Sequence, residues 1–435
     1  MLTNALPAFL MKSPVLQRKM KSIIYRHKPG FIGLFCIFCL SLLFSMPQAV
    51  SQPSHLHISL AIPEREQSMA VNVTWIHASD CLEQSVQYGR TPDYNKESRS
   101  QVIHAEYGCV HKSVLADLQP STRYYYRVGS DMTGWSDMYS FKTAQPPGSS
   151  EPFKVAVFGD TQNNEFNTEF EKTERIIESL TTYNTDFSIH YGDIVVNGSY
   201  TDSWLDFIDT AQPLIAESPM MVTLGNHDIV NAYNDRFQQP YPIFYELFSM
   251  PGNGLDYSFI YGNAYFVCLY SGNPARAQDK GLIRYGPGSP ERAWLERELE
   301  QARANPEVDW IIAYMHYPVY SYGPSNIAGW KEHIAPIFDK YGVDLCLAGH
   351  RHAYERHYPI FNGERADDNM GTVYITNGTS GGSPQGIGGF DLPTMAFTIT
   401  ERMYNYALMT ISGKTLEYHV YDINDVLIDH FKMEK

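Results

Sequence analysis

The sequence predicts an α/β protein in which a layered core of strands and helices follows a smaller all-β domain. Five short apolar runs between residues 154 and 348 are separated by helical stretches, an alternation typical of buried parallel strands. Strand-like segments divided by turns precede them between residues 53 and 143. Tyr is abundant at 31 copies and, with Phe and Trp, supplies many strand-forming aromatic side chains.

The first 51 residues form a candidate export signal. They contain six Lys or Arg and no Asp or Glu, then run apolar from residue 31 to 44. A basic segment followed by an apolar one is typical of a signal peptide, and small residues lie at the spacing for cleavage before Gln52. The alternative is an uncleaved membrane anchor, although the apolar run is shorter than the roughly 20 residues of a spanning helix. We therefore expect a secreted or periplasmic protein with no stable membrane span after cleavage.

Residues 52–144 are expected to form the all-β sandwich, with a structural or docking role. Around residues 118–128, a Leu before a turn and several tyrosines on the following strand resemble the corner of a fibronectin type III domain. Cys81 and Cys109 both fall in this domain and could form a disulfide in an exported protein.

A linker rich in Pro, Gly and Ser at residues 145–152 leads to the predicted catalytic domain at residues 153–435. Helices are expected near residues 167–182, 203–217, 290–304 and 330–340, between strands that begin near residues 154, 187, 220, 309 and 343. A hairpin is expected from residue 257, and the chain returns to strands after Met370. Cys268 and Cys346 lie in apolar runs and are expected to be buried thiols, because no Cys spacing resembles a zinc site.

A residue able to bind a metal ion follows each of the five apolar strands. The segments are Gly-Asp at 159–160, Gly-Asp at 192–193, Gly-Asn-His-Asp at 225–228, His316 and Gly-His-Arg-His at 349–352. Singly each is weak, but α/β sheets bind ligands at the carboxyl ends of their strands, so these residues should meet at one edge. Carboxylates, imidazoles and an amide suit two metal ions that clamp a phosphoryl group and activate a water.

These motifs, together with Ala-Gly-His-Arg-His-Ala-Tyr-Glu-Arg-His-Tyr-Pro from residue 348, resemble the purple acid phosphatases of the calcineurin-like metallophosphoesterase superfamily. With the preceding β domain, the similarity covers nearly all of residues 53–433. It implies two divalent or trivalent metal ions: one is iron, and the other is zinc, manganese or a second iron. The resemblance also implies a role for each ligand: Asp193 bridges both ions, Asp160 and His352 hold the first, and Asn226, His316 and His350 hold the second. It further implies that His227 contacts the phosphate and protonates the leaving group. Asp228 is expected to orient His227 rather than to bind metal.

One position departs from the family pattern. Purple acid phosphatases carry a Tyr three residues after the second Asp, and its phenolate binds ferric iron and gives the colour, but Val196 stands here. We expect a protein that is not purple and whose first metal need not be ferric iron. Gln162 stands where related phosphoesterases place a His ligand, and it is either a replacement ligand or a hydrogen-bonding neighbour. The phosphate-binding histidines of plant relatives have no counterpart in residues 320–326, and Glu355 and Arg356 are expected to form a structural ion pair.

The expected activity is hydrolysis of small phosphomonoesters by a metal-activated hydroxide, of the acid phosphatase type. Two alternatives stay open: a phosphodiesterase acting on nucleotide or lipid diesters, and a catalytically inactive secreted binding protein. The choice of substrate lies in loops 229–255, 272–289 and 320–329, which the motifs do not determine. A formal net charge of -15, more negative once the basic N-terminal segment is removed, argues against a nucleic-acid partner. Oligomeric state is not indicated.

Overall fold

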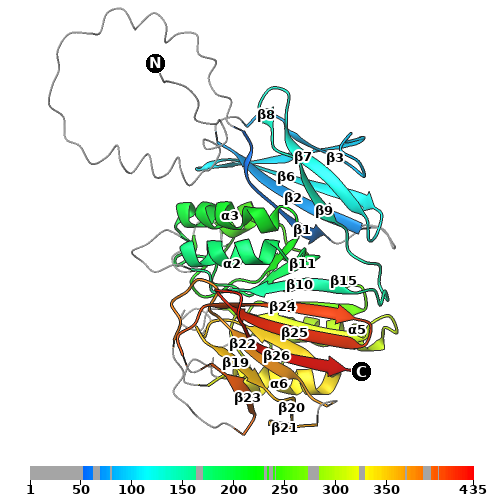
Figure 1. Cartoon of the computed structure of the whole chain (residues 1–435), viewed down its shortest axis with the longest axis vertical. Helices are drawn as coiled ribbons and strands as arrows, with labels where there is room; N and C mark the ends of the chain where they lie inside the picture. The colour runs from blue at the N-terminus through cyan, green and yellow to red at the C-terminus, as the bar shows by residue number, and fades with distance from the viewer. Residues whose placement is uncertain are drawn as a thin grey trace, which may run out of the picture. The chain divides into compact units, whose positions relative to one another are not determined.

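The computed structural model describes residues 52–61, 69–78, 81–162, 170–229, 233–234, 239–240, 242–272, 284–322, 329–367, 370–385, 393–399 and 401–435 (Figure 1). The predicted signal peptide lies outside these residues. The part of the chain from Ser51 to Lys435 is one compact unit. Within the described residues, no helix has the length and apolarity needed to cross a membrane.

Two antiparallel sheets form the N-terminal sandwich. One contains β1 (Ser54–Ala61), β2 (Met69–His77), β6 (Gly108–Leu118) and β5 (Gln101–Ala105), and the other contains β4 (Lys96–Arg99), β3 (Ser85–Gly89), β7 (Arg123–Ser130), β8 (Gly134–Trp135) and β9 (Tyr139–Lys142). Alternate residues of β7 are buried, which fills the space between the sheets with Tyr124, Tyr126 and Val128. The predicted Cys81–Cys109 disulfide is confirmed.

Two larger sheets form the rest of the chain. The first runs in the order β12 (Met220–Val222), β11 (Phe187–His190), β10 (Phe153–Phe158), β24 (Asn405–Ser412), β25 (Thr415–Asp422) and β26 (Leu427–Glu434). The second runs in the order β15 (Tyr257–Tyr261), β16 (Ala264–Leu269), β17 (Trp310–Met315), β18 (Leu345–Ala348), β22 (Val373–Asn377), β19 (Tyr354–His357) and β23 (Met395–Thr398). Strands β10 to β12 are parallel, as are β16, β17, β18 and β22. Two small pairs, β13 (Tyr233–Asn234) with β14 (Gln239–Pro240) and β20 (Ile360–Phe361) with β21 (Glu364–Arg365), complete the strands.

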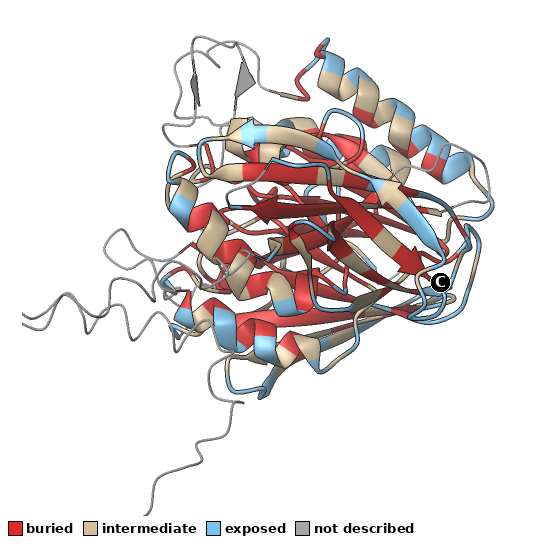
Figure 2. Cartoon of the chain, turned by 90° about the horizontal axis from the view of Figure 1, so that it is seen from above, coloured by how far each residue is buried: buried red, intermediate tan, exposed pale blue. Residues whose placement is uncertain are grey.

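Helices cover the outer faces of both large sheets. They are α2 (Glu171–Thr181), α3 (Thr201–Ile215), α4 (Pro242–Leu247), α5 (Pro290–Ala304) and α6 (Trp330–Tyr341). The first three pack with Ala156 and Phe158 of the first sheet, and the last two pack with Ile311 and Ala313 of the second. Figure 2 shows buried residues concentrated on the strands between these layers. The layered α/β prediction, with an all-β domain before it, is confirmed; the specific likeness to fibronectin type III remains a prediction.

Local sequence explains where these helices begin and end. At α5, the Ser289 side chain accepts a hydrogen bond from the N–H of Arg292, and Pro290 occupies the first turn, where its missing N–H costs nothing. Helix α6 ends at Gly342, whose φ of 68° is the left-handed conformation that stops a helix. Both helices match their predicted bounds within a residue.

Some finer predictions need correction. Glu355 and Arg356 do not pair with each other: Arg356 donates two hydrogen bonds to Asp429, while Glu355 accepts hydrogen bonds from Ser321 and the N–H of Tyr322. Neighbouring strand residues point to opposite faces of a sheet, so the predicted pair was wrong. Cys268 and Cys346 are buried free thiols, as expected.

The N-terminal sandwich is bonded to the helix layer of the first large sheet. The N–H of Leu56 in β1 donates to Gln212 Oε1 of α3 at 2.9 Å, and the Tyr126 hydroxyl donates to the carbonyl of Ala216 at 2.6 Å. Ala216 follows α3 but belongs to the hydrophobic core of the sandwich. The two parts of the chain therefore share buried surface and buried hydrogen bonds.

We predict that Tyr126→Phe destabilises the protein by about 1–3 kcal/mol, because it leaves the buried Ala216 carbonyl without its donor. Urea unfolding would measure the change. Tyr125→Phe is the matched control, since Tyr125 is the next residue of β7 and points to the partly exposed face. Equal stability of the two variants would show that the hydroxyl contributes nothing to the junction.

Candidate metal centre

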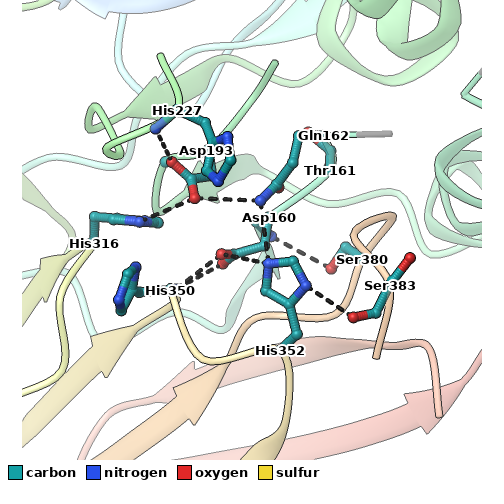
Figure 3. A network of polar contacts seen from close by, with 12 residues as sticks. Asp160, Thr161, Gln162, Asp193, His227, His316, His350, His352, Ser380 and Ser383 are labelled. Carbon is teal, nitrogen blue, oxygen red and sulfur yellow. Dashed lines mark hydrogen bonds and ion pairs between the residues drawn. The ribbon is translucent and has the colours of Figure 1, made fainter. Parts of the chain in front are cut away.

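The candidate ligands follow the carboxyl ends of strands from both large sheets (Figure 3). Asp160 comes after β10 and Asp193 after β11 in the first sheet, while His316 comes after β17 and His350 after β18 in the second. Asp160, Asp193 and His350 have φ values of 51°, 51° and 67°, so the chain turns sharply at each of them. This left-handed turn directs side chains from both sheets into one site.

Two glycines allow these turns to approach one another closely. A Cβ atom at position 349 would lie 2.1 Å from Asp160 Oδ2 and 2.7 Å from the ring of Tyr191, and one at position 225 would lie 2.1 Å from Asp193 Oδ1. No side chain fits at either position. Tyr191 is fully buried against these loops and donates a hydrogen bond to the Asn377 carbonyl. Tyr191 was not among the predicted site residues, and its position between a strand and a ligand motif is the only sequence signal for it.

One half of the site contains Asp160, Gln162 and His352. Asp160 accepts hydrogen bonds from the N–H of His350 at 2.9 and 3.0 Å, and its Oδ1 lies 3.6 Å from His352 Nε2. The Nδ1–H of His352 donates to the Ser383 carbonyl at 2.9 Å, so Nε2 carries the lone pair and faces the site. Gln162 Nε2 lies 3.2 Å from Asp193 Oδ2 and 3.1 Å from His352 Nε2.

The other half contains Asn226, His316 and His350, with Asp193 between the halves. His316 Nε2 lies 3.2 Å from Asp193 Oδ2 and 3.1 Å from Asn226 Oδ1, while His350 Nδ1 lies 2.8 Å from the same Asn226 oxygen. Ligand atoms of Asp193, His316 and His350 all lie within 4.8 Å of one another. Oxygen and nitrogen donors this close, from four separate loops, are the arrangement that a bound cation requires.

The hydrogen bonds of His316 show that this centre is built around positive charge. Its Nδ1 lies 3.0 Å from the Tyr191 carbonyl, so all of its polar neighbours, on both nitrogens, are acceptors. Without a metal ion, these contacts are satisfied only when the ring carries two protons. Burial would lower the pKa of His316, but Asp193 raises it to about 9. A metal ion on Nε2 would replace that proton, so the residues present fit a metal site.

Burial and neighbouring charges also shift the pKa values of the two aspartates in the site. Burial raises the pKa of Asp160 well above its usual value, against the opposing influence of His316. Burial would also raise the pKa of Asp193, but the charge of His316 and hydrogen bonds from His316 and His227 lower it. Asp193 is therefore held as an anion at the centre of the site, where a carboxylate shared by two cations is most useful.

His227 and Asp228 lie beside Asp193. The N–H of His227 donates to Asp193 Oδ1 at 2.7 Å, and its ring Nδ1 donates to the Val196 carbonyl at 2.9 Å. The carboxylate of Asp228 accepts from the N–H groups of Ile194, Val195 and Gly225, and burial raises its pKa to about 7. Asp228 thus orders the loops on either side of His227, while the ring itself is oriented by a backbone carbonyl.

Comparison with known proteins matches the chain to two described families. The family described as "Calcineurin-like phosphoesterase" matches residues 153–354, and the family described as "Purple acid Phosphatase, N-terminal domain" matches residues 53–143. The chain belongs to the purple acid phosphatase-like metallophosphoesterases. Its predicted family is confirmed, and it is a metal-dependent phosphoesterase.

Three named relatives align with most of the chain. "Probable purple acid phosphatase 20" of Arabidopsis thaliana is 29% identical over 357 residues, 77% of this chain and 75% of the relative. "Acid phosphatase type 7" of Homo sapiens is 28% identical over 442 residues, 91% of this chain and 94% of the relative. The solved purple acid phosphatase PPD1 of yellow lupin (Lupinus luteus) matches with a TM-score of 0.74 and 20% identity, over 88% of this chain and 74% of the lupin chain. The lupin match shows the shared fold.

We predict that Gly349→Ala lowers the rate of phosphoester hydrolysis by about 100-fold, because the new methyl group displaces the Asp160 carboxylate or the Tyr191 ring. Steady-state kinetics at fixed metal concentration would measure the loss. Gly363→Ala is the control for glycine replacement away from the site: its φ of 82° disfavours a side chain, but a Cβ there meets nothing within 4 Å. Full activity of Gly349→Ala would mean that the crowding around Asp160 does not position it.

Proposed function

We propose that this protein is a secreted dinuclear-metal phosphoesterase that hydrolyses phosphomonoesters, as acid phosphatases do. One observation carries the proposal: carboxylate, imidazole and amide donors from five strand ends converge on a single site in which Asp193 is shared by both halves. The relatives named as acid phosphatases support the activity. The buried and anionic Asp193 is what a pair of cations needs as a bridge.

The ligand roles follow from which atoms face the site. We assign Asp160, His352 and Asp193 to the first ion, and Asn226, His316, His350 and Asp193 to the second. Bound ions would supply a hydroxide nucleophile and neutralise the charge of the phosphoryl group. Hydrogen bonds from His316 to the Tyr191 carbonyl and from His352 to the Ser383 carbonyl fix the tautomers that leave Nε2 free for coordination.

His227 has the geometry of an acid that serves the leaving group. Its Nδ1–H is held by the Val196 carbonyl and its N–H by Asp193, which leaves Nε2 unconstrained at the partly exposed side of the site. We propose that the protonated ring contacts the phosphate and donates the Nε2 proton to the departing alcohol oxygen.

The identity of the metals depends on position 196. A further Arabidopsis thaliana relative, 25% identical over 411 residues, is named "Fe(3+)-Zn(2+) purple acid phosphatase 12", and we propose an iron-containing pair here, with zinc, manganese or iron as the second ion. Val196 cannot ligate, so the protein should lack the purple colour. Gln162 Oε1 is buried and has no hydrogen-bond partner among the described residues; a half-turn of its amide would place this oxygen between Asp193 and His352. We propose that it takes the vacant ligand position.

The domain organisation and export of the chain are part of this proposal. We assign residues 1–51 to a signal peptide, 52–144 to the N-terminal domain, 145–152 to a linker and 153–435 to the catalytic domain. The Cys81–Cys109 disulfide supports an oxidising compartment, since such bonds are rare in the cytosol. A small phosphoester is the proposed substrate.

The deciding experiment measures metal content and hydrolysis together, with p-nitrophenyl phosphate and bis-p-nitrophenyl phosphate as substrates between pH 4 and 9. We predict two ions per chain and preferential monoester turnover. Asp193→Asn should lose roughly 100-fold or more in metal affinity together with turnover, because it removes the bridging charge. Asp202→Asn, an exposed residue of α3, is the control.

The other outcomes point to the two alternatives. A preference for the diester substrate would indicate a phosphodiesterase. Absence of both metal and turnover after reconstitution with iron, zinc or manganese would indicate a binding protein. Asp193→Asn with unchanged metal content would refute the ligand assignment.

Arg351 is a candidate for the substrate contact that the missing histidines would supply. It lies between two proposed ligands in Gly-His-Arg-His, and its Nε is buried with no hydrogen-bond partner among the described residues. Its positive charge helps lower the pKa of His350, to which burial contributes most, so the guanidinium is close to the centre. We propose that it binds a non-transferring oxygen of the phosphate.

We predict that Arg351→Met raises KM for p-nitrophenyl phosphate about tenfold while kcat changes little. A contact that binds the phosphate equally well in the bound substrate and in the transition state contributes to substrate binding and not to the chemical step. Arg365→Met, an exposed arginine stacked on Tyr358, is the control. An unchanged KM would place Arg351 outside the substrate site.

A further inference from the structure

The exposed face of β25 and β26 carries a cluster of potential ligands on the first large sheet, apart from the strand ends that form the catalytic centre. Residues of β25 alternate, so Leu416, Tyr418 and Val420 are buried while Glu417 and His419 are partly exposed. His430 of β26 is exposed on the same side. We call Glu417, His419 and His430 the strand-face cluster.

The backbone holds this cluster in a fixed geometry. His419 and His430 are direct partners in the antiparallel register of β25 and β26, and their rings stack with centroids 4.3 Å apart and 26° between planes. One ligand atom from each of Glu417, His419 and His430 lies within 4.8 Å of the others. Adjacent strands fix the backbone positions, so only side-chain rotations remain free.

The donor atoms of the cluster are available. Within the described part of the chain, none of its three side chains makes a hydrogen bond. The other contacts are the Tyr421 ring, 6.4 Å from that of His419, and the charge of Lys432, whose ammonium is paired with Glu434. Two stacked imidazoles repel each other when both are protonated, so the 4.3 Å stacking of these rings favours a neutral form. Neutral imidazole is the form that binds metal ions.

We propose that the strand-face cluster binds a divalent transition-metal ion of the zinc type, separate from the catalytic pair. Two imidazole nitrogens and one carboxylate oxygen, with water as the fourth ligand, form a recognised tetrahedral donor set for zinc, whereas calcium and magnesium require oxygen ligands. Ligand atoms about 2.0–2.1 Å from a tetrahedral ion lie roughly 3.4 Å apart. Small rotations of these exposed side chains close the present separations to that value.

The ion would connect the last strand of the chain to its neighbour. β26 is the edge strand of the sheet and pairs with β25 alone in the strand order. A metal bridge between His419 and His430 adds a link across this pair that does not depend on backbone hydrogen bonds. Zinc binding is therefore expected to stabilise the C-terminal edge of the fold.

The test counts zinc ions by equilibrium dialysis of the mature protein at increasing free zinc, after the catalytic centre has been filled. Wild type should bind one more zinc ion per chain than His430→Ala, and removal of this ligand should weaken binding at that site by roughly 100-fold or more. His419→Ala should behave in the same way. His333→Ala, which removes a partly exposed histidine on α6, should match the wild type.

Two of the variants and one crystal structure separate this site from the catalytic one. His430→Ala should keep wild-type hydrolysis, which also shows that it folds, whereas Asp193→Asn should lose the catalytic ions and keep the additional zinc ion. A zinc-soaked crystal should give an anomalous peak between β25 and β26. Equal zinc binding by wild type and His430→Ala, or the absence of that peak, would overturn the proposal.

Discussion

Two fully buried carboxylates, Asp160 and Asp193, set the constraint on which the arrangement of the site depends. Removing a carboxylate from water is costly unless cations or hydrogen-bond donors replace the solvent. Here the replacement comes from His316 and from backbone N–H groups of the loops that follow β12 and β18. The two large sheets pack face to face around a shared core. Because the donors belong to both sheets, the loops at the carboxyl ends of their strands must lie side by side at this point. The packing of Tyr191 and the two glycines without room for a side chain are consequences of that arrangement.

Much of this arrangement follows from the order of residues along the chain. Apolar runs identify the central strands, because a strand that is covered on both faces has no polar side. The residue that follows each run identifies a ligand, since it lies at the carboxyl end of the strand. A sequence can therefore show which side chains reach the same edge. It does not show their tautomers or their distances, since these depend on carbonyl groups such as those of Tyr191, Val196 and Ser383, which every residue possesses.

Contacts between residues far apart in the sequence were the features that the sequence predicted least well. Arg356 finds Asp429, 73 positions away, and Tyr126 finds the carbonyl of Ala216, 90 positions away. No sequence pattern distinguishes Asp429 from other acidic residues, or Ala216 from other residues that follow a helix. The division into an N-terminal and a catalytic part is visible from composition, but the shared core at Ala216 is not, because a small apolar residue after a helix has no distinguishing signal.

The left-handed backbone at Asp160, Asp193 and His350 restricts which residues these positions accept. Asp, Asn and His occupy that conformation far more readily than branched side chains do, and they are also among the common metal-binding types. The demands of the backbone and of coordination chemistry therefore select from the same short set of amino acids. A branched replacement such as valine would fail on both grounds at once, so the loss it causes would not measure coordination alone. Asparagine preserves the turn while removing the charge, and so isolates the electrostatic contribution of each aspartate from its conformational one.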